Sequence, residues 1–149
     1  MEFERQQGEG NRRAMKQIVE SGEIPGILAY QASEPIGWCS VAPREAFHSL
    51  NRSPVLKRID QKQVWSIVCF FIARGYRNRG VTIDLIKAAV HYIRRKGGKV
   101  IEAYPTDPRG RRLAPVSSFM GLPSVYEKAG FVECGRPSKS KAIMRYYIK

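Results

Sequence analysis

The sequence predicts a single domain of the α/β class, with a mixed, mostly antiparallel sheet built around one parallel β-α-β crossover. The strongest strand pattern, Val64–Ile72, leads into the strongest helical pattern, which begins at Gly80. A further strand, Val100–Tyr104, follows that helix, and strand–helix–strand is the pattern of a parallel crossover. Short strand pairs on either side predict antiparallel hairpins, and 149 residues are enough for one domain with its own core.

The residues before the crossover predict a short helix and a hairpin. Residues 1–10, rich in Glu, Gln and Gly, are expected to form a loose arm of the domain. The helix spans Arg12–Glu20 and ends at Gly22. Strands at Ile27–Tyr30 and Ile36–Val41 are joined by a turn at Ser33–Pro35.

The crossover itself has the clearest signals. Val64–Ile72 is β-branched and aromatic throughout, as expected of a buried strand. Apolar residues then recur at intervals of three, four and three, which places one stripe on a helix: Ile83, Ile86, Val90 and Ile93. Cations followed by Gly97 and Gly98 end that helix, because glycine supplies a left-handed cap.

The C-terminal part predicts a loop, a helix and a closing hairpin. The loop Pro105–Pro115 is rich in proline and arginine and leads to a short helix near Ser124–Ala129. Phe131–Cys134 and Ile143–Ile148 are expected to pair as the last two strands.

The charge balance indicates anionic partners. The chain has 26 Lys and Arg against 13 Asp and Glu, a net charge of +13. Such a balance favours phosphorylated small molecules or nucleic acid. Eleven of the cations and three of the acidic residues lie between Arg74 and Arg112.

Several classes are disfavoured by the sequence. The polar start has no apolar run like a signal peptide, and no stretch is long enough to cross a bilayer. Cys39, Cys69 and Cys134 are odd in number and contain no C-x-x-C pair, which predicts reduced thiols and gives no zinc signature. We therefore expect a cytoplasmic protein without a metal or a membrane partner.

A glycine turn joins the best strand to the best helix. The segment Gly75–Thr82 reads GYRNRGVT. Amides at a helix start lack intrahelical partners and carry the positive end of the helix dipole, so they can bind a phosphate. Gly80 allows close approach of an anion, and Arg77 and Arg79 add charge-assisted hydrogen bonds.

Two phosphate motifs compete for this turn. The P-loop pattern matches Gly75, Gly80 and Thr82, but Val81 replaces its lysine, so nucleotide hydrolysis is not expected. The other is the [QR]-x-x-G-x-[GA] signature of the GNAT superfamily of N-acetyltransferases. Arg77–Thr82 resembles that signature, although Thr82 stands where Gly or Ala is usual.

A second motif strengthens the resemblance. Tyr126–Phe131 (YEKAGF) is similar to the Y-E-x-x-G-F segment that closes the last helix of many GNAT members. The likeness covers about Ile24 to Lys149 and implies the acyl-coenzyme A N-acyltransferase fold. One departure is that only about twenty residues precede the first hairpin, so the family's first strand is either missing or supplied by a partner subunit.

The resemblance implies acetyl-coenzyme A as co-substrate and an amine as acceptor. In this family the sheet splays on one side of the central strand, here between Val64–Ile72 and Val100–Tyr104, and the acyl-coenzyme A enters that gap. A backbone N–H near Phe71 or Ile72 would polarise the thioester carbonyl, and Tyr126 would protonate the departing thiolate. The cofactor-binding residues implied are Phe71, Ile72, Arg77, Asn78, Arg79, Gly80, Val81 and Thr82.

The base that deprotonates the amine is less constrained. Glu102 lies on the strand expected to border the acceptor and is the favoured candidate. Asp107, His48 and Glu45 are weaker candidates from neighbouring segments, and His91 is expected to be structural or exposed.

Other readings stay open. A non-catalytic acyl-coenzyme A-binding protein would keep the cofactor turn and lack a working acceptor site. A basic nucleic-acid or tRNA-associated protein would use the cationic surface, including Arg109–Arg112. The resemblance also leaves a homodimer open, and it does not identify the amine.

Overall fold

The computed structural model describes residues 26–77, 79–108 and 121–149, so the predicted helix Arg12–Glu20 lies outside it. Within these ranges the strands are β1 (Gly26–Gln31), β2 (Glu34–Pro43), β3 (Trp65–Ile72), β4 (Val100–Ala103), β5 (Val132–Ser138) and β6 (Lys141–Tyr147). The helices are α3 (His48–Arg52), α4 (Val81–Arg95) and α5 (Pro123–Lys128), with 3-10 turns η1 (Arg44–Ala46) and η2 (Arg74–Tyr76).

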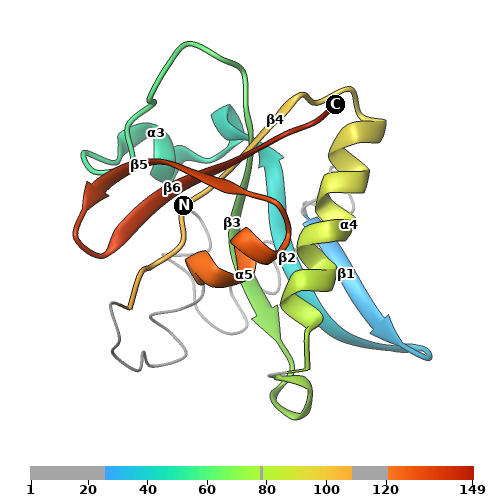
Figure 1. Ribbon diagram of the computed structural model, residues 1–149. Coiled ribbons are helices and arrows are strands. Elements are labelled where there is room, and N and C mark those ends of the chain that lie inside the picture. Colours follow the sequence, from blue (N-terminus) through green and yellow to red (C-terminus); the bar gives the residue numbers. More distant parts are fainter. Residues whose placement is uncertain (1–25, 78, 109–120) are drawn as a thin grey trace.

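The six strands form one sheet in the order β1-β2-β3-β4-β6-β5. Only β3 and β4 run parallel, and every other neighbouring pair is antiparallel. The predicted mixed sheet with one central crossover is therefore confirmed (Figure 1).

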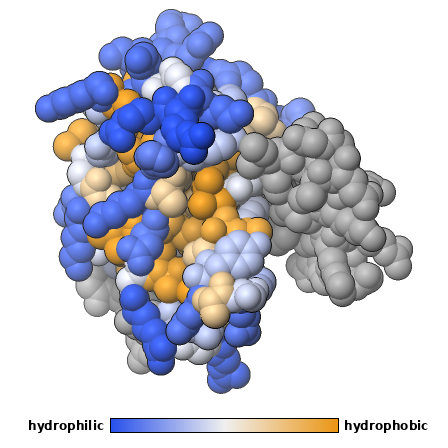
Figure 2. Space-filling view, turned by 90° about the vertical axis from the view of Figure 1, so that its right-hand side faces the viewer, coloured by the Kyte–Doolittle hydropathy of each residue, from blue (hydrophilic) through white to orange (hydrophobic). Residues whose placement is uncertain are grey.

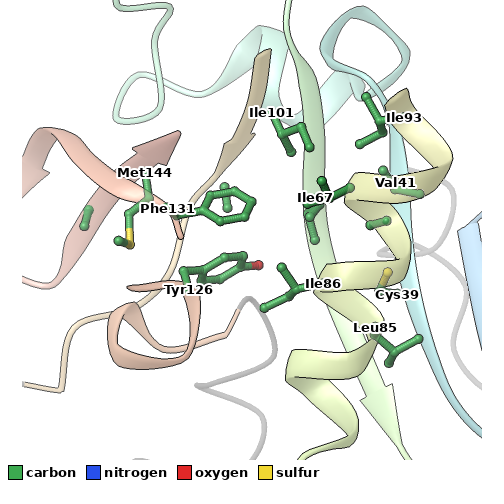
Figure 3. Close-up of a cluster of buried hydrophobic side chains, with 14 residues drawn as sticks. Cys39, Val41, Ile67, Leu85, Ile86, Ile93, Ile101, Tyr126, Phe131 and Met144 are labelled. Carbon is green, nitrogen blue, oxygen red and sulfur yellow. The ribbon is translucent and has the colours of Figure 1, made fainter. Parts of the chain in front are cut away.

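Both faces of the sheet are covered by other elements. Helices α4 and α5 pack on one face, where the main core unites residues of β2, β3, β4, β6 and both helices (Figure 3). The segment containing η1 and α3 covers part of the other face through Phe47, Leu50 and Leu56. We call the face that carries α4 and α5 the helical face, and the opposite face the α3 face.

Helix α4 follows the predicted pattern. Its buried residues are Leu85, Ile86, Ala89, Val90 and Ile93, so the stripe is centred slightly away from the half-buried Ile83. At its end, the N–H of Gly98 donates to the carbonyl of Ile93 (2.9 Å) and that of Gly97 to Arg94 (3.1 Å). With Gly97 at φ +86°, this is the glycine cap that the sequence predicts.

Two local expectations need adjustment. Glu34 and Pro35 belong to β2, so the hairpin turns earlier, at Ala32 and Ser33, with Ala32 in the left-handed region at φ 54°. Between β2 and β3 the chain forms η1 and α3, for which the sequence analysis gives no helix.

Candidate active site

The sheet opens between β3 and β4. The parallel pairing covers only three residue pairs and ends at Ile67 with Ala103, whereas β3 continues to Ile72. Beside this point, Ser40 and Val41 of β2 pair with Cys69 and Ile67, so Val68 is an extra residue and forms a β-bulge. Among the residues that the structure describes, the lower half of β3 therefore pairs with β2 alone, and α5 lies beside it (Figure 1).

The backbone of β3 offers amides to this gap. The N–H of Ala73 donates to the carbonyl of Ile36 on the β2 side (2.8 Å). Because N–H groups alternate along a strand, those of Phe70 and Ile72 point away from β2, toward the gap. Of the two predicted positions, Ile72 is the one whose amide points toward the gap. Phe71 instead presents an exposed ring on the α3 face.

The glycine turn continues directly from this edge. Gly80 is the N-cap of α4, has φ +80°, and no side chain caps the helix. The first bond of the helix runs from the N–H of Asp84 to the carbonyl of Gly80 (3.1 Å), so the amides of residues 81–83 precede the hydrogen-bonded ladder. Val81 and Thr82 are half-buried at this start.

The arginines of the turn are exposed. Arg77 donates from Nε to the carbonyl of Ile72 (3.2 Å), and the guanidinium of Arg79 lies 5.8 Å from the centre of the Tyr76 ring. Figure 2 shows apolar residues across the middle of the face that carries α4 and β1, with hydrophilic residues toward the lower end, where Figure 1 places this turn. Asn78, also predicted to bind cofactor, lies outside the described residues.

Tyr126 lies on α5 and is completely buried on the helical face. Its ring contacts Phe70 of β3 and Phe131, with centroid distances of 6.2 and 5.1 Å. Its hydroxyl is directed toward the region of Ile67 and Ile86 (Figure 3). Burial raises the pKa of this phenol well above its usual value, and the nearby thiols of Cys39 and Cys69 add to the effect. The phenol is therefore held in its neutral form.

Glu102 lies on the opposite face of the sheet from Tyr126. Its neighbours Ile101 and Ala103 belong to the core that contains Tyr126, and strand alternation turns Glu102 toward the α3 face. Its Oε1 accepts from Arg44 (3.2 Å) and from the Tyr104 hydroxyl (2.8 Å), and its Oε2 accepts from Arg145 (2.9 Å). Both oxygens are thus occupied by donors, two of them cationic. This geometry argues against Glu102 as the base.

These contacts belong to a buried charged cluster that the sequence reasoning missed. Arg44 also donates to the carbonyl of Leu56 and to the Tyr104 hydroxyl (2.5 and 2.8 Å). Arg145 extends the cluster outward to Asp60, which accepts two bonds at 2.7 and 3.0 Å and has its pKa lowered to about 2 by them. No local signal identifies this set, because Glu102 is 58 residues from Arg44 and 43 from Arg145.

The structure does not bring the weaker base candidates, Glu45, Asp107 and His48, together at one site. Glu45 is exposed and paired with Arg58, and its pKa is lowered, chiefly by a hydrogen bond from its own backbone. Asp107 pairs with Arg136 (2.9 Å), and His48 is exposed at the start of α3. His91 is exposed on α4, as expected.

Residues 26–77, 79–108 and 121–149 contain neither a metal-binding cluster nor a membrane-spanning helix. In these ranges no three His, Cys, Asp or Glu side chains are placed to hold a metal ion. The helices in the same ranges are all too short or too polar to cross a membrane.

The site thus consists of an open β3–β4 edge that leads into an uncapped helix started by Gly80, with a buried phenol beside it. The model of the acetyltransferase (GNAT) family matches residues 2–114, more than half of the chain. The protein belongs to this family of acyltransferases, whose acyl donor is acetyl-coenzyme A.

Solved structures share the fold. A ribosomal-protein-alanine N-acetyltransferase from Brucella melitensis superposes with a TM-score of 0.58 at 15% identity, covering 94% of this chain and 78% of that one. A GNAT-family acetyltransferase from Streptococcus pneumoniae gives 0.58 at 15% identity, covering 96% and 78%. The PaiA N-acetyltransferase from Thermoplasma acidophilum, solved with coenzyme A, gives 0.55 at 18% identity, covering 93% and 71%. A comparison with curated proteins gives no match.

Proposed function

We propose that this protein transfers the acetyl group of acetyl-coenzyme A directly to an amine while both substrates are bound. The observation that carries the proposal is that the gap between β3 and β4 continues directly into the glycine turn. The edge of β3 that no described strand covers runs from Val68 to Ile72 and reaches the start of α4 a few residues later. An extended pantetheine and a pyrophosphate are joined in the same order in coenzyme A.

The cofactor would be held largely by backbone groups. The amides at the start of α4, which precede its hydrogen-bonded ladder, suit the pyrophosphate, and the left-handed Gly80 leaves no side chain between the phosphate and the helix start. Arg77 and Arg79 add positive charge beside it. The pantetheine amides would pair with the open edge of β3 like an added strand.

The reacting thioester would then lie near the end of that edge. The N–H of Ile72 points into the gap and suits the thioester carbonyl oxygen, on which negative charge develops. Tyr126 would donate its proton to the leaving thiolate. A raised phenol pKa alone opposes this transfer, but a thiolate placed in the same apolar site is also destabilised, so its proton affinity rises as well.

Two titrations test the cofactor assignment. We expect acetyl-coenzyme A to bind in isothermal titration calorimetry with a micromolar Kd, and ATP to bind much more weakly. The double variant Arg77→Ala, Arg79→Ala is expected to weaken binding about tenfold or more, because two charge-assisted contacts are lost. The matched control is Arg94→Ala, Arg95→Ala, which makes the same charge change at the other end of α4.

Catalysis is tested by thiol release from acetyl-coenzyme A with a panel of peptide, amino-acid, polyamine and aminoglycoside amines. Release that depends on one class of amine supports the transferase. Binding without release in the presence of any amine would instead favour a non-catalytic acyl-coenzyme A-binding protein. If the double variant Arg77→Ala, Arg79→Ala binds acetyl-coenzyme A as tightly as the wild type does, the assignment of the pyrophosphate to the glycine turn is wrong.

A further inference from the structure

Lys141 is a half-buried lysine whose Nζ contacts the chain as it leaves β4, at the end of β4 where pairing with β3 stops. It is the first residue of β6 and forms an isolated bridge with Thr106. Its Nζ donates to the carbonyl of Tyr104 and to the Thr106 hydroxyl, both at 3.0 Å. The adjoining Ala142 N–H donates to the carbonyl of Pro105 (3.2 Å), so this end of β6 is fixed against the chain that leaves β4.

A short series of contacts links Lys141 to Tyr126. Thr106, which accepts from the lysine, donates its own N–H to the carbonyl of Gly121 (3.1 Å). Gly121 lies so close to the gap that a methyl group on it would come within 2.8 Å of the Tyr126 ring and 3.3 Å of the Phe70 ring. Two residues therefore separate the lysine from the phenol.

The two groups lie on opposite sides of the sheet. Ala142 and Met144 of β6 pack in the core that contains Tyr126. Strand alternation sends Lys141, Ile143 and Arg145 to the α3 face, which agrees with the burial of Ile143 against Phe47 and Leu50. A thioester in the gap would thus have a proton donor on one side and a lysine on the other.

We infer that Lys141 is the base that removes a proton from the acceptor amine, an inference that rests on the proposed function. Addition to a thioester carbonyl takes place from one face, so the base belongs on the side from which the amine arrives. Tyr126 serves the sulfur from the other side. Glu102, the alternative on the α3 face, has both oxygens engaged by Arg44, Tyr104 and Arg145.

The surroundings of Lys141 favour its neutral form. Burial lowers the pKa of its ammonium from 10.5 to about 8. At pH 7 about a tenth of the molecules then carry a neutral amine, against about one in three thousand for an unperturbed lysine. The charges around it are largely compensated, since Asp107 pairs with Arg136 and Glu102 with Arg44 and Arg145.

The acceptor ammonium gives a proton to the Nζ lone pair of Lys141 and becomes a neutral amine. The amine attacks the thioester carbon, the C–N bond forms, and the C–S bond breaks with its electron pair on sulfur. The thiolate takes the proton of Tyr126, and the phenolate recovers one from the new ammonium nitrogen through water. Lys141 returns its proton to solvent, so each turnover releases one proton.

Lys141→Arg tests the inference because arginine keeps the charge and the donors but cannot act as a base. We expect kcat/KM to fall by about 10²- to 10⁴-fold, with acetyl-coenzyme A affinity within about twofold of wild type. The wild-type pH profile should rise with an inflection near pH 8, and Lys141→Arg should lack it. The matched control is Lys139→Arg, an exposed lysine in the same hairpin turn, which should behave as wild type.

A second measurement does not depend on the acceptor. In a titration of the full chain labelled with ¹³Cε-lysine and followed by NMR, one lysine signal should titrate near pH 8 and be absent from Lys141→Arg. Titration of that signal near pH 10.5, or full activity of Lys141→Arg with an unchanged pH profile, overturns the inference. Either result would leave acetyl-coenzyme A binding and amine-dependent thiol release intact, whereas failure of those two in the wild type contradicts the proposed function itself.

Discussion

Replacing Glu102 by Gln separates a structural role from a catalytic one. The substitution keeps the shape of the side chain and removes its charge. In the buried cluster, the charges of Arg44 and Arg145 are balanced by Glu102 and Asp60, and Asp60 lies at the surface end. Glu102→Gln leaves two guanidinium groups with one carboxylate. The new amide NH2 also faces a donor, either Arg44 Nη1 or Arg145 Nε.

The expected cost is large. Removing one partner of a buried ion pair destabilises a protein by about 3–5 kcal/mol, because the other charge stays buried without compensation. For a chain of this length about 1 kcal/mol corresponds to 2–4 °C in Tm, so Tm should fall by about 6–20 °C. An exposed pair contributes only about 0–1 kcal/mol. Glu133→Gln, which disrupts the exposed pair with Arg136, is therefore the control.

Urea unfolding followed by circular dichroism measures the free energy of unfolding of both variants. We expect a large loss for Glu102→Gln and a change below about 1 kcal/mol for Glu133→Gln. If Glu102→Gln unfolds within 1 kcal/mol of wild type while kcat falls a hundredfold or more, the structural argument is refuted. Glu102 would then return as the base.

Three further predictions follow from the site and the core. Tyr126→Phe should keep acetyl-coenzyme A affinity and lower kcat by about 10²-fold or more; an unchanged kcat would take Tyr126 out of the acid role. Gly80→Ala and Gly97→Ala each place a methyl group at a left-handed position, at opposite ends of α4. Urea unfolding should show about 1 kcal/mol of destabilisation for both variants. Calorimetry should show weaker acetyl-coenzyme A binding only for Gly80→Ala. Burial raises the pKa of Cys39 to about 12 and of Cys69 to about 11, above their unfolded value of 9.0, so stability should be full below pH 9 and fall as the pH rises toward 12. Urea unfolding from pH 7 to 11 measures this, and a flat profile above pH 9 would contradict it.

The sequence predicts best what neighbouring residues decide. The limits of α4 follow from a 3.6-residue apolar period and a glycine cap, both of which are local. The parallel crossover and its flanking hairpins are predicted from strand and helix patterns that are also local. The gap between β3 and β4 was predicted from the family resemblance alone, since no residue pattern states that two parallel strands separate after Ile67.

The function of Glu102 could not be predicted from its neighbours. On a strand whose four residues are all buried, alternation of polarity does not indicate which face a carboxylate takes. Its partners Arg44 and Arg145 come from distant segments, and only the folded sheet brings them together. Lys141 was missed for a related reason, because its burial depends on the chain that leaves β4.

The bulge at Val68 accounts for the arrangement of the gap. Before it, Ile67 faces the helical side and Val68 the α3 side. Without an extra residue, simple alternation would turn Phe70 and Ile72 to the α3 face; in the structure they pack on the helical face, and Phe71 takes the other. This exchange puts Phe70 against the Tyr126 ring and occurs where pairing with β4 ends. The extra residue Val68 thus occurs where the edge opens and turns Phe70 toward the phenol. A variant that lacks Val68 should therefore lose the contact between the Phe70 and Tyr126 rings together with the gap.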